Sequence, residues 1–239
     1  MTARERYVDL LMGCLTRELF LDQEGVAPDI RAEGRDWPAT AETMVGRRRL
    51  DNVRQAVETV LVERVPGDLI ETGVWRGGVT ILMRGILAAW EDPDRRVWVA
   101  DSFQGLPRPN IVDYPDDDGH DLSGVSALMV SADEVRDNFD RYGLLDDRVH
   151  FLEGWFADTL APAPIEQIAV LRLDGDLYES TMDALVALYD RVSPGGFVIV
   201  DDYGAWEPCR KAVEDFRTDR NITDEIHEVD WTGVYWRTS

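Results

Sequence analysis

Short apolar runs alternate with helical patterns through most of the chain. The runs predict buried strands at residues 68–71, 96–100, 149–152, 168–173 and 197–200. Apolar positions at helical spacing predict helices at residues 76–90, 131–142, 179–191 and 208–217. Ser131, with Glu134 three residues later, is typical of a helix N-cap. The stretch Ser193–Gly196 predicts a turn, and residues 226–230 and 234–237 predict an antiparallel hairpin around Trp231–Gly233.

Strands that alternate with helices indicate a mostly parallel sheet covered by helices on both faces. The predicted strands and hairpin fit an α/β fold with a seven-stranded Rossmann-like sheet, which we expect to occupy residues 67–239. Residues 1–66 predict an N-terminal helical extension, with a helix over 3–20, an irregular stretch over 21–40 and one or two helices over 40–65. We expect this extension to cover the active site or to pair with a second subunit.

The composition narrows the choice of partners. The 239 residues carry a formal net charge of -22, which repels phosphate backbones and anionic membranes, although acidity also serves solubility. No apolar run approaches the roughly 18 residues of a membrane-spanning helix, and the N-terminus has no signal-peptide pattern. We therefore expect a cytoplasmic protein that binds neither nucleic acid nor membrane. Cys14 and Cys209 are interpreted as reduced structural thiols.

The first predicted strand ends in an acidic, glycine-rich loop, Glu71 to Gly78 (ETGVWRGG). Its spacing differs from the G-x-G-x-x-G of dinucleotide sites, and the acid at position 71 would repel a diphosphate. The same acid would attract a cationic ligand, and S-adenosylmethionine presents an ammonium and a sulfonium. A merely structural glycine turn is the alternative.

The second and third strand ends suit the rest of a nucleoside. Asp101 follows the glycine loop by about the 20 residues expected of an acid that binds ribose hydroxyls. The alternative for Asp101 is a cap on the next turn. Trp155 and Phe156 follow the third strand, where they would flank an adenine or simply pack in the core.

Acidic residues end the fourth and fifth strands, in Asp174-Gly175-Asp176 and Asp201-Asp202. Because the carboxyl ends of parallel strands meet at one edge of the sheet, these carboxylates would repel each other unless a cation lay among them. Hard oxygen ligands favour Mg²⁺, so Asp174, Asp201 and Asp202 are the predicted ligands. Helix capping or turn formation is the alternative for each aspartate taken singly.

Several blocks, in order, resemble the macrocin O-methyltransferase family, the sugar O-methyltransferases of antibiotic biosynthesis: TMVGRRRLDN, ETGVWRGG, DSFQGLP, GWFADTL, LRLDGDLYEST and SPGGFVIVDDY. The resemblance implies a class I S-adenosylmethionine-dependent methyltransferase, with Mg²⁺ held by Asp174, Asp201 and Asp202. Its cofactor motifs map to Glu71, Gly73, Trp75, Asp101 and Ser102, with Thr43 and Met44 near the cofactor. It also implies a homo-oligomer and, as acceptor, a deoxysugar hydroxyl on a natural-product glycoside or a nucleotide sugar.

The resemblance is weakest over residues 1–34 and 108–129. The second segment is acidic and rich in turn formers, which predicts either a mobile lid over the acceptor or a solvated loop. It contains His120, which together with Asp174 is a candidate base for the acceptor hydroxyl. His150 and His227 receive no role.

Three other functions compete. A nicotinamide-dependent oxidoreductase predicts a G-x-G-x-x-G loop, and that pattern is absent from the loop after the first strand. A non-catalytic binding module predicts loss of the strand-end acids, which the chain retains. A metal-dependent catechol or phenol O-methyltransferase shares the general plan, often with Asp-Asn where this chain has Asp201-Asp202.

Overall fold

A seven-stranded sheet forms the centre of the molecule in the computed structural model, which describes residues 1–21 and 23–239. The strand order is β3-β2-β1-β4-β5-β7-β6. Strands β1 to β5 are parallel, and β7 runs antiparallel to both β5 and β6. The strands are β1 (Asp68–Thr72), β2 (Val97–Asp101), β3 (Val149–Glu153), β4 (Ile168–Leu173), β5 (Val192–Val200), β6 (His227–Glu228) and β7 (Val234–Arg237). The predicted fold class is confirmed.

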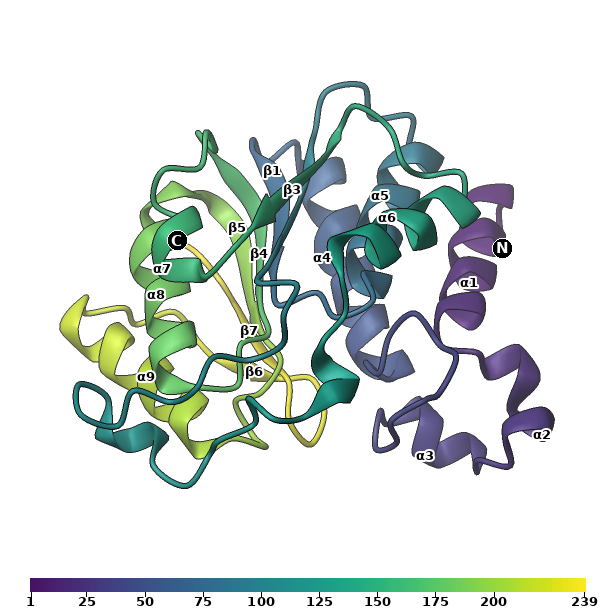
Figure 1. The fold of residues 1–239 in the computed structure, drawn as a ribbon. Helices are drawn as coiled ribbons and strands as arrows, with labels where there is room; N and C mark the ends of the chain where they lie inside the picture. Colours follow the sequence, from purple (N-terminus) through teal and green to yellow (C-terminus); the bar gives the residue numbers. More distant parts are fainter.

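Helices cover both faces of the sheet (Figure 1). One face packs against α4 (Arg47–Glu63), α5 (Gly78–Ala89) and α6 (Ala132–Arg141), and α1 (Ala3–Leu15) packs on the outer side of α5. The other packs against α7 (Phe156–Thr159), α8 (Tyr178–Leu188) and α9 (Glu207–Asp219). Each face has its own apolar cluster because successive residues of a strand point to opposite sides.

The sequence explains the central elements. Every residue of β4 is buried, as expected for a parallel strand covered on both faces. Helix α5 is buried along ten consecutive residues because it lies between the sheet, α1 and α4. The Ser131 hydroxyl accepts a hydrogen bond from the Glu134 amide at 3.2 Å, which confirms the predicted cap of α6.

The N-terminal region differs in detail from the prediction. Helix α1 ends at Leu15 rather than at residue 20, and it packs against α5. The contact requires Gly85, because a Cβ there would lie 2.3 Å from Leu11 Cδ2. A short 3₁₀ helix, Glu18–Phe20, and two short helices, α2 (Leu21–Glu24) and α3 (Pro28–Ala32), follow in the region predicted to be irregular.

The prediction of a turn at Ser193–Gly196 is wrong, because β5 already begins at Val192. The pairing with β4 shifts register there, from Ile168 opposite Val192 to Val170 opposite Phe197. The C-terminal Thr238 holds the bulged stretch: its hydroxyl donates to the Ser193 carbonyl, and its carbonyl accepts from the Gly195 amide. The turn formers therefore make a bulge inside the strand.

The topology brings the predicted site residues to one edge of the sheet. The strand order reverses between β1 and β4, where α/β folds bind ligands at the carboxyl ends of the strands. Thr72 pairs with Leu173, and Leu173 pairs with Val200, so Gly73, Asp174 and Asp201 follow these strands side by side. In the described ranges, no helix is long and apolar enough to cross a membrane.

Candidate active site

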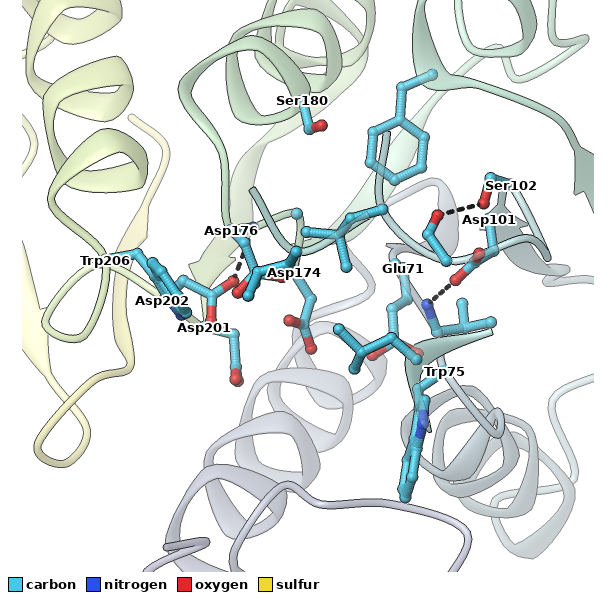
Figure 2. A pocket seen from close by; sticks show the side chains of 18 of the residues that line it. Glu71, Trp75, Asp101, Ser102, Asp174, Asp176, Ser180, Asp201, Asp202 and Trp206 are labelled. Atoms are coloured by element: carbon cyan, nitrogen blue, oxygen red, sulfur yellow. Dashed lines mark hydrogen bonds between the residues drawn. The ribbon is translucent and has the colours of Figure 1, made fainter. Parts of the chain in front are cut away.

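A cavity of about 670 Å³ opens at the carboxyl ends of β1, β2, β4 and β5. All residues predicted for the cofactor and the metal line it. These are Thr43, Met44, Glu71, Gly73, Trp75, Asp101, Ser102, Trp155, Phe156, Asp174, Asp201 and Asp202. Figure 2 labels Glu71, Trp75, Asp101, Ser102 and the three predicted metal ligands. His120 is not among the lining residues; its ring lies edge-on to Trp206, which lines the cavity, with ring centroids 5.7 Å apart.

Gly73 allows the first and fourth strand ends to meet. Its φ is +87°, and a Cβ at this position would lie 1.7 Å from the Asp174 carbonyl oxygen. The Asp174 amide donates to the Thr72 carbonyl at 2.9 Å, so the backbone itself fixes this approach. The glycine of the first loop is therefore needed to place Asp174 beside the predicted cofactor loop.

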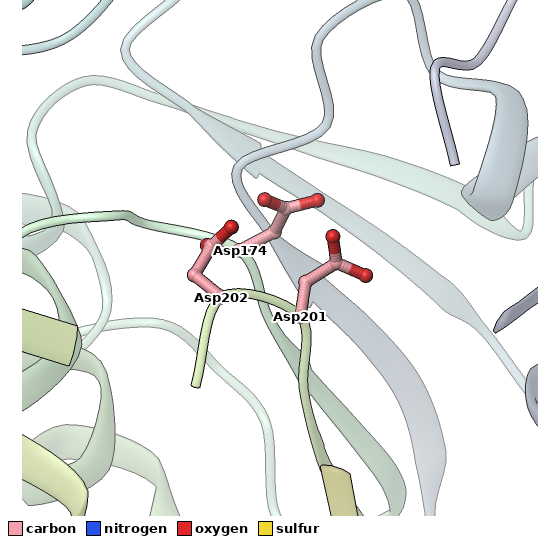
Figure 3. A group of neighbouring side chains, drawn as sticks. All are labelled: Asp174, Asp201 and Asp202. Carbon is pink, nitrogen blue, oxygen red and sulfur yellow. The ribbon is translucent and has the colours of Figure 1, made fainter. Parts of the chain in front are cut away.

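The carboxylates of Asp174, Asp201 and Asp202 point toward one another (Figure 3). One oxygen from each lies within 4.8 Å of the others, as a shared metal ion requires. Asp201 and Asp202 are buried, with 4% and 8% exposure. The prediction that these acids converge is thus met by the geometry.

Arg172 connects the two halves of the cavity. It lies in β4, is 0% exposed, and donates from Nη1 to both Glu71 and Asp174, with 2.7 Å to Asp174 Oδ2. Its Nη2 donates to Asp201. One guanidinium thus fixes the positions of three acidic side chains from three adjacent strand ends.

A second arginine joins the N-terminal region to the same acids. Arg49, in the first turn of α4, donates from Nη1 to Asp201 and from Nε to Asp230 at 3.1 Å. Both oxygens of Asp201 are therefore bonded to arginines, one on Arg172 and one on Arg49. The residues preceding the sheet thus contribute directly to the site.

The acidic side chains at these strand ends outnumber Arg49 and Arg172. Burial and mutual repulsion raise the pKa values of Asp174, Asp176 and Asp202. Burial raises the pKa of Asp174, and the nearby Asp201 raises it further. Burial, together with Asp176, Asp174 and Asp201, raises the pKa of Asp202 well above its usual range. The pKa of Asp176 rises to about 8 through burial and the neighbouring Asp174. An added dication would relieve this repulsion.

Glu71 lies where the methyl donor is predicted to bind. It is 1% exposed, and burial raises its pKa to about 8 although Arg172 acts in the opposite direction. Its Oε1 accepts from Arg172, whereas Oε2 is buried and has no partner among the groups that the structure describes. A buried oxygen without a hydrogen bond is costly, so an ammonium-bearing ligand fits this place.

Asp101 ties the first two loops together. Its Oδ2 accepts from the Val74 amide and its Oδ1 from the Phe103 amide, both at 2.8 Å. The capping alternative is therefore realised, and each oxygen retains a second lone pair for a ribose hydroxyl. Ser102 donates its hydroxyl to the Gly105 carbonyl at 2.7 Å and so closes the turn after β2.

Left-handed backbone marks three loops of the cavity. Trp75 after β1, Phe103 after β2 and Asp176 after β4 have φ values of +48°, +56° and +56°. Residues other than glycine adopt this conformation at a cost, and such residues cluster at functional sites.

Phe156, at the start of α7, lies near Gly175, with its Cε2 3.5 Å from where a Cβ of Gly175 would be.

Sequence reasoning missed several residues of the site. Arg172 carried a signal, since an arginine within the apolar run IAVLRL calls for a buried partner. Arg49 carried none, because it sits among three successive arginines and only the fold selects one of them. Trp37, Trp206 and Trp231 also line the cavity from three separate parts of the chain.

Known proteins match this chain over its whole length. Residues 6–238 match the macrocin-O-methyltransferase (TylF) family. The chain belongs to the macrocin O-methyltransferase family. A Streptomyces olivaceus protein named 8-demethyl-8-(2,3-dimethoxy-alpha-L-rhamnosyl)-tetracenomycin-C 4'-O-methyltransferase is 54% identical, over 98% of this chain and 93% of its own. The demethyldecarbamoylnovobiocin O-methyltransferase of Streptomyces niveus is 52% identical, over 97% and 92%.

A solved structure has the same fold as this chain. The structure of the O-methyltransferase NovP superposes with a TM-score of 0.96 at 52% identity and covers 99% of both chains. This macrocin-family chain is therefore an O-methyltransferase with the class I fold, whose methyl donor is S-adenosylmethionine. Family membership sets aside the oxidoreductase and the non-catalytic binding module.

Proposed function

We propose that this macrocin-family enzyme is a Mg²⁺-dependent methyltransferase that methylates a deoxysugar hydroxyl on a natural-product glycoside of antibiotic biosynthesis. The observation that carries the proposal is the convergence of Asp174, Asp201 and Asp202 beside the cofactor loop, with one oxygen of each within 4.8 Å of the others. The rhamnosyl acceptor named for the Streptomyces olivaceus relative supports a sugar as the methylated group.

The three aspartates fit a hard dication. Asp174 Oδ1 and Asp202 Oδ1 accept no hydrogen bond from the part of the chain that the structure describes, so both are available as ligands. Asp201 is held by Arg49 and Arg172 and would bind through a remaining lone pair. Mg²⁺ prefers such oxygen ligands, and when bound it acts as a Lewis acid toward a sugar hydroxyl.

The chain's own residues would orient the two reactants. Methyl transfer is an in-line displacement, and holding the reactants aligned supplies much of the acceleration. The loop carrying Glu71, Gly73 and Trp75 would hold the methyl donor. Asp174, which lies between this loop and Asp201, is the proposed acceptor of the hydroxyl proton, at a carboxylate lone pair that neither Mg²⁺ on Oδ1 nor Arg172 on Oδ2 would occupy. His120 is the second candidate; it does not line the cavity, but its ring contacts Trp206, which does.

The charge of the cavity favours a finished glycoside over a nucleotide sugar. Beyond the metal acids, the lining includes Asp36, Asp158, Asp176, Glu179 and Asp183. Its arginines are Arg49, paired with Asp201 and Asp230, and the exposed Arg108, 3.6 Å from Asp121. A diphosphate would meet net negative charge without a free cation in the described lining. The aromatic lining suits a neutral glycoside better.

The test is methyl transfer to three acceptors: a rhamnosyl glycoside, the matching nucleotide sugar and a catechol. We expect turnover of the glycoside, its loss in excess chelator and its return when magnesium is restored. Full activity in excess chelator would refute the metal requirement, and faster methylation of the catechol would refute the sugar. Cytoplasmic location and a homo-oligomeric state stay predictions.

A further inference from the structure

A buried carboxylate lies in the middle of the acidic segment 108–129. Asp117 is 0% exposed, whereas its neighbours Asp116 and Asp118 are exposed. Its Oδ1 accepts from the Tyr178 amide at 2.6 Å, and its Oδ2 accepts from the Glu179 amide at 3.1 Å. Both oxygens thus bind the first amides of α8, a helix that lies 61 residues later in the chain.

This arrangement is a helix cap supplied from a distance. The residue at the N-cap position of α8 is Leu177, and it provides no side-chain hydrogen bond. The first amides of a helix need acceptors, and a carboxylate there also interacts favourably with the helix dipole. A buried carboxylate is costly without such partners. Asp117 and the start of α8 therefore stabilise each other, and neither is satisfied if the segment moves away.

The cap lies midway along a wall of the cavity. Residues on both sides of it line the cavity: Arg108 and Asn110 before it, Leu122 and Leu128 after it. The segment leaves β2, crosses to α8 and α9, and returns to the cofactor loop (Figure 1). On the returning part, Trp75 donates from Nε1 to the Ala127 carbonyl at 2.8 Å. The segment is thus fixed at its middle by Asp117 and near its end by the cofactor loop.

Helix α8 begins directly after the loop that carries Asp174. That loop is short and fixed: the Leu177 amide donates to the Gly175 carbonyl at 2.6 Å, and the Asp176 amide donates to Asp202 at 3.2 Å. The bonds from Asp117 therefore join the wall formed by residues 108–129 to the strand-end loop that supplies a predicted metal ligand.

We propose that Asp117 is a positioning residue, whose buried carboxylate holds segment 108–129 against the start of α8 and so shapes the acceptor side of the cavity. The role in acceptor binding rests on the proposed function, whereas the attachment to α8 does not. The cofactor side is held separately, through Trp75 and Ala127. Loss of Asp117 should consequently weaken acceptor binding and leave cofactor binding intact.

The test compares Asp117→Asn and Asp117→Ala with Asp118→Asn, which removes the same charge one residue away at an exposed position. We expect the KM for the glycoside to rise roughly 5- to 30-fold in Asp117→Ala, the range that corresponds to about 1–2 kcal/mol for a lost N-cap. The KM of Asp117→Asn should lie between those of the wild type and Asp117→Ala, because the single amide oxygen can replace only one of the two carboxylate acceptors. The affinity for S-adenosylhomocysteine should stay within about twofold, since the effect on the acceptor side is local.

Hydrogen exchange separates this role from general stability. In the wild type, the Tyr178 and Glu179 amides should be protected; in the Asp117 variants, exchange should accelerate at these amides and in residues 108–129, and not in Asp118→Asn. Unprotected Tyr178 and Glu179 amides in the wild type would overturn the proposal, even if no acceptor were turned over. An unchanged KM, or faster exchange throughout the chain with equal loss of acceptor and cofactor binding, would also overturn it.

Discussion

Arg172→Met tests whether one buried guanidinium holds the acids of the site together. Arg172 is 0% exposed and bonds to Glu71, Asp174 and Asp201. Removing one partner of a buried ion pair typically costs about 3–5 kcal/mol. In a domain of this size, each kcal/mol lowers Tm by roughly 2–4 °C, so we expect a fall of about 6–20 °C. The Tm of Arg172→Lys should fall less than that of Arg172→Met, because lysine keeps the positive charge. It should still fall, because one ammonium cannot span three carboxylates.

The loss of stability in Arg172→Met should increase as the pH rises. Burial raises the pKa of Glu71 from 4.5 to about 8 in the folded chain, and removal of the guanidinium would raise it further. Between the unfolded-state and folded-state pKa values of Glu71, the folded state binds more protons than the unfolded state, so stability falls as pH rises. In Arg172→Met the folded-state pKa is higher, so this fall continues to a higher pH than in the wild type. The Tm deficit of Arg172→Met should accordingly be larger at pH 8 than at pH 6, and added magnesium should reduce it by binding the folded state.

The assay is thermal unfolding at pH 6 and pH 8, with and without magnesium, using Arg84→Met as the matched control. Arg84 is also buried but pairs with Asp146, whose pKa is lowered by the hydrogen bond from Arg84. Its removal should cost stability equally at pH 6 and pH 8. A deficit in Arg172→Met below about 1 kcal/mol, far from the expected cost of a broken buried pair, would refute the reasoning. A deficit that is the same at both pH values would refute it as well.

Three further changes have defined outcomes. Asp101→Asn should lower S-adenosylhomocysteine affinity about 10- to 100-fold in calorimetry, since the amide group cannot accept both backbone bonds that position the cofactor loops; unchanged affinity would contradict this role. Gly73→Ala should lower the free energy of unfolding by about 3 kcal/mol or more, and Tm with it, because its Cβ would overlap the Asp174 carbonyl oxygen; a soluble variant of normal Tm would contradict the close approach. In native protein, a thiol reagent should modify Cys14 and spare Cys209, whose pKa is raised well above its usual range by burial and by Asp202; two reacting thiols before denaturation would contradict this burial.

The sheet and the strand-end acids could be predicted because both depend on local patterns. Apolar runs set the strands, and a parallel sheet brings its carboxyl ends together whatever the details of packing. Asp174 and Asp201 meet for this reason, through the pairing of Leu173 with Val200. The sequence could not place Arg49 or Asp117, because each binds a partner fixed only by tertiary structure: Asp230 lies 181 residues from Arg49, and Tyr178 lies 61 residues from Asp117.

The prediction of a turn at Ser193–Gly196 is wrong for a related reason. Proline and glycine mark a break in regular pairing, but they do not distinguish a turn from a bulge within a strand. The distinction here depends on Thr238, which bonds to the Ser193 carbonyl from the far end of the chain. The acidic segment 108–129 shows the same limit: its composition predicts exposure, yet Asp117 is fully buried.

The most direct measurement is a crystal of the enzyme with S-adenosylhomocysteine, soaked in Mn²⁺ as an anomalous substitute for Mg²⁺. We expect one anomalous peak bound by oxygens of Asp174, Asp201 and Asp202, next to the cofactor. Site-specific loss of that peak in Asp174→Asn would add support. A cofactor-bound crystal whose Mn²⁺ lay elsewhere, or whose Asp174 pointed away from the other two aspartates, would contradict it.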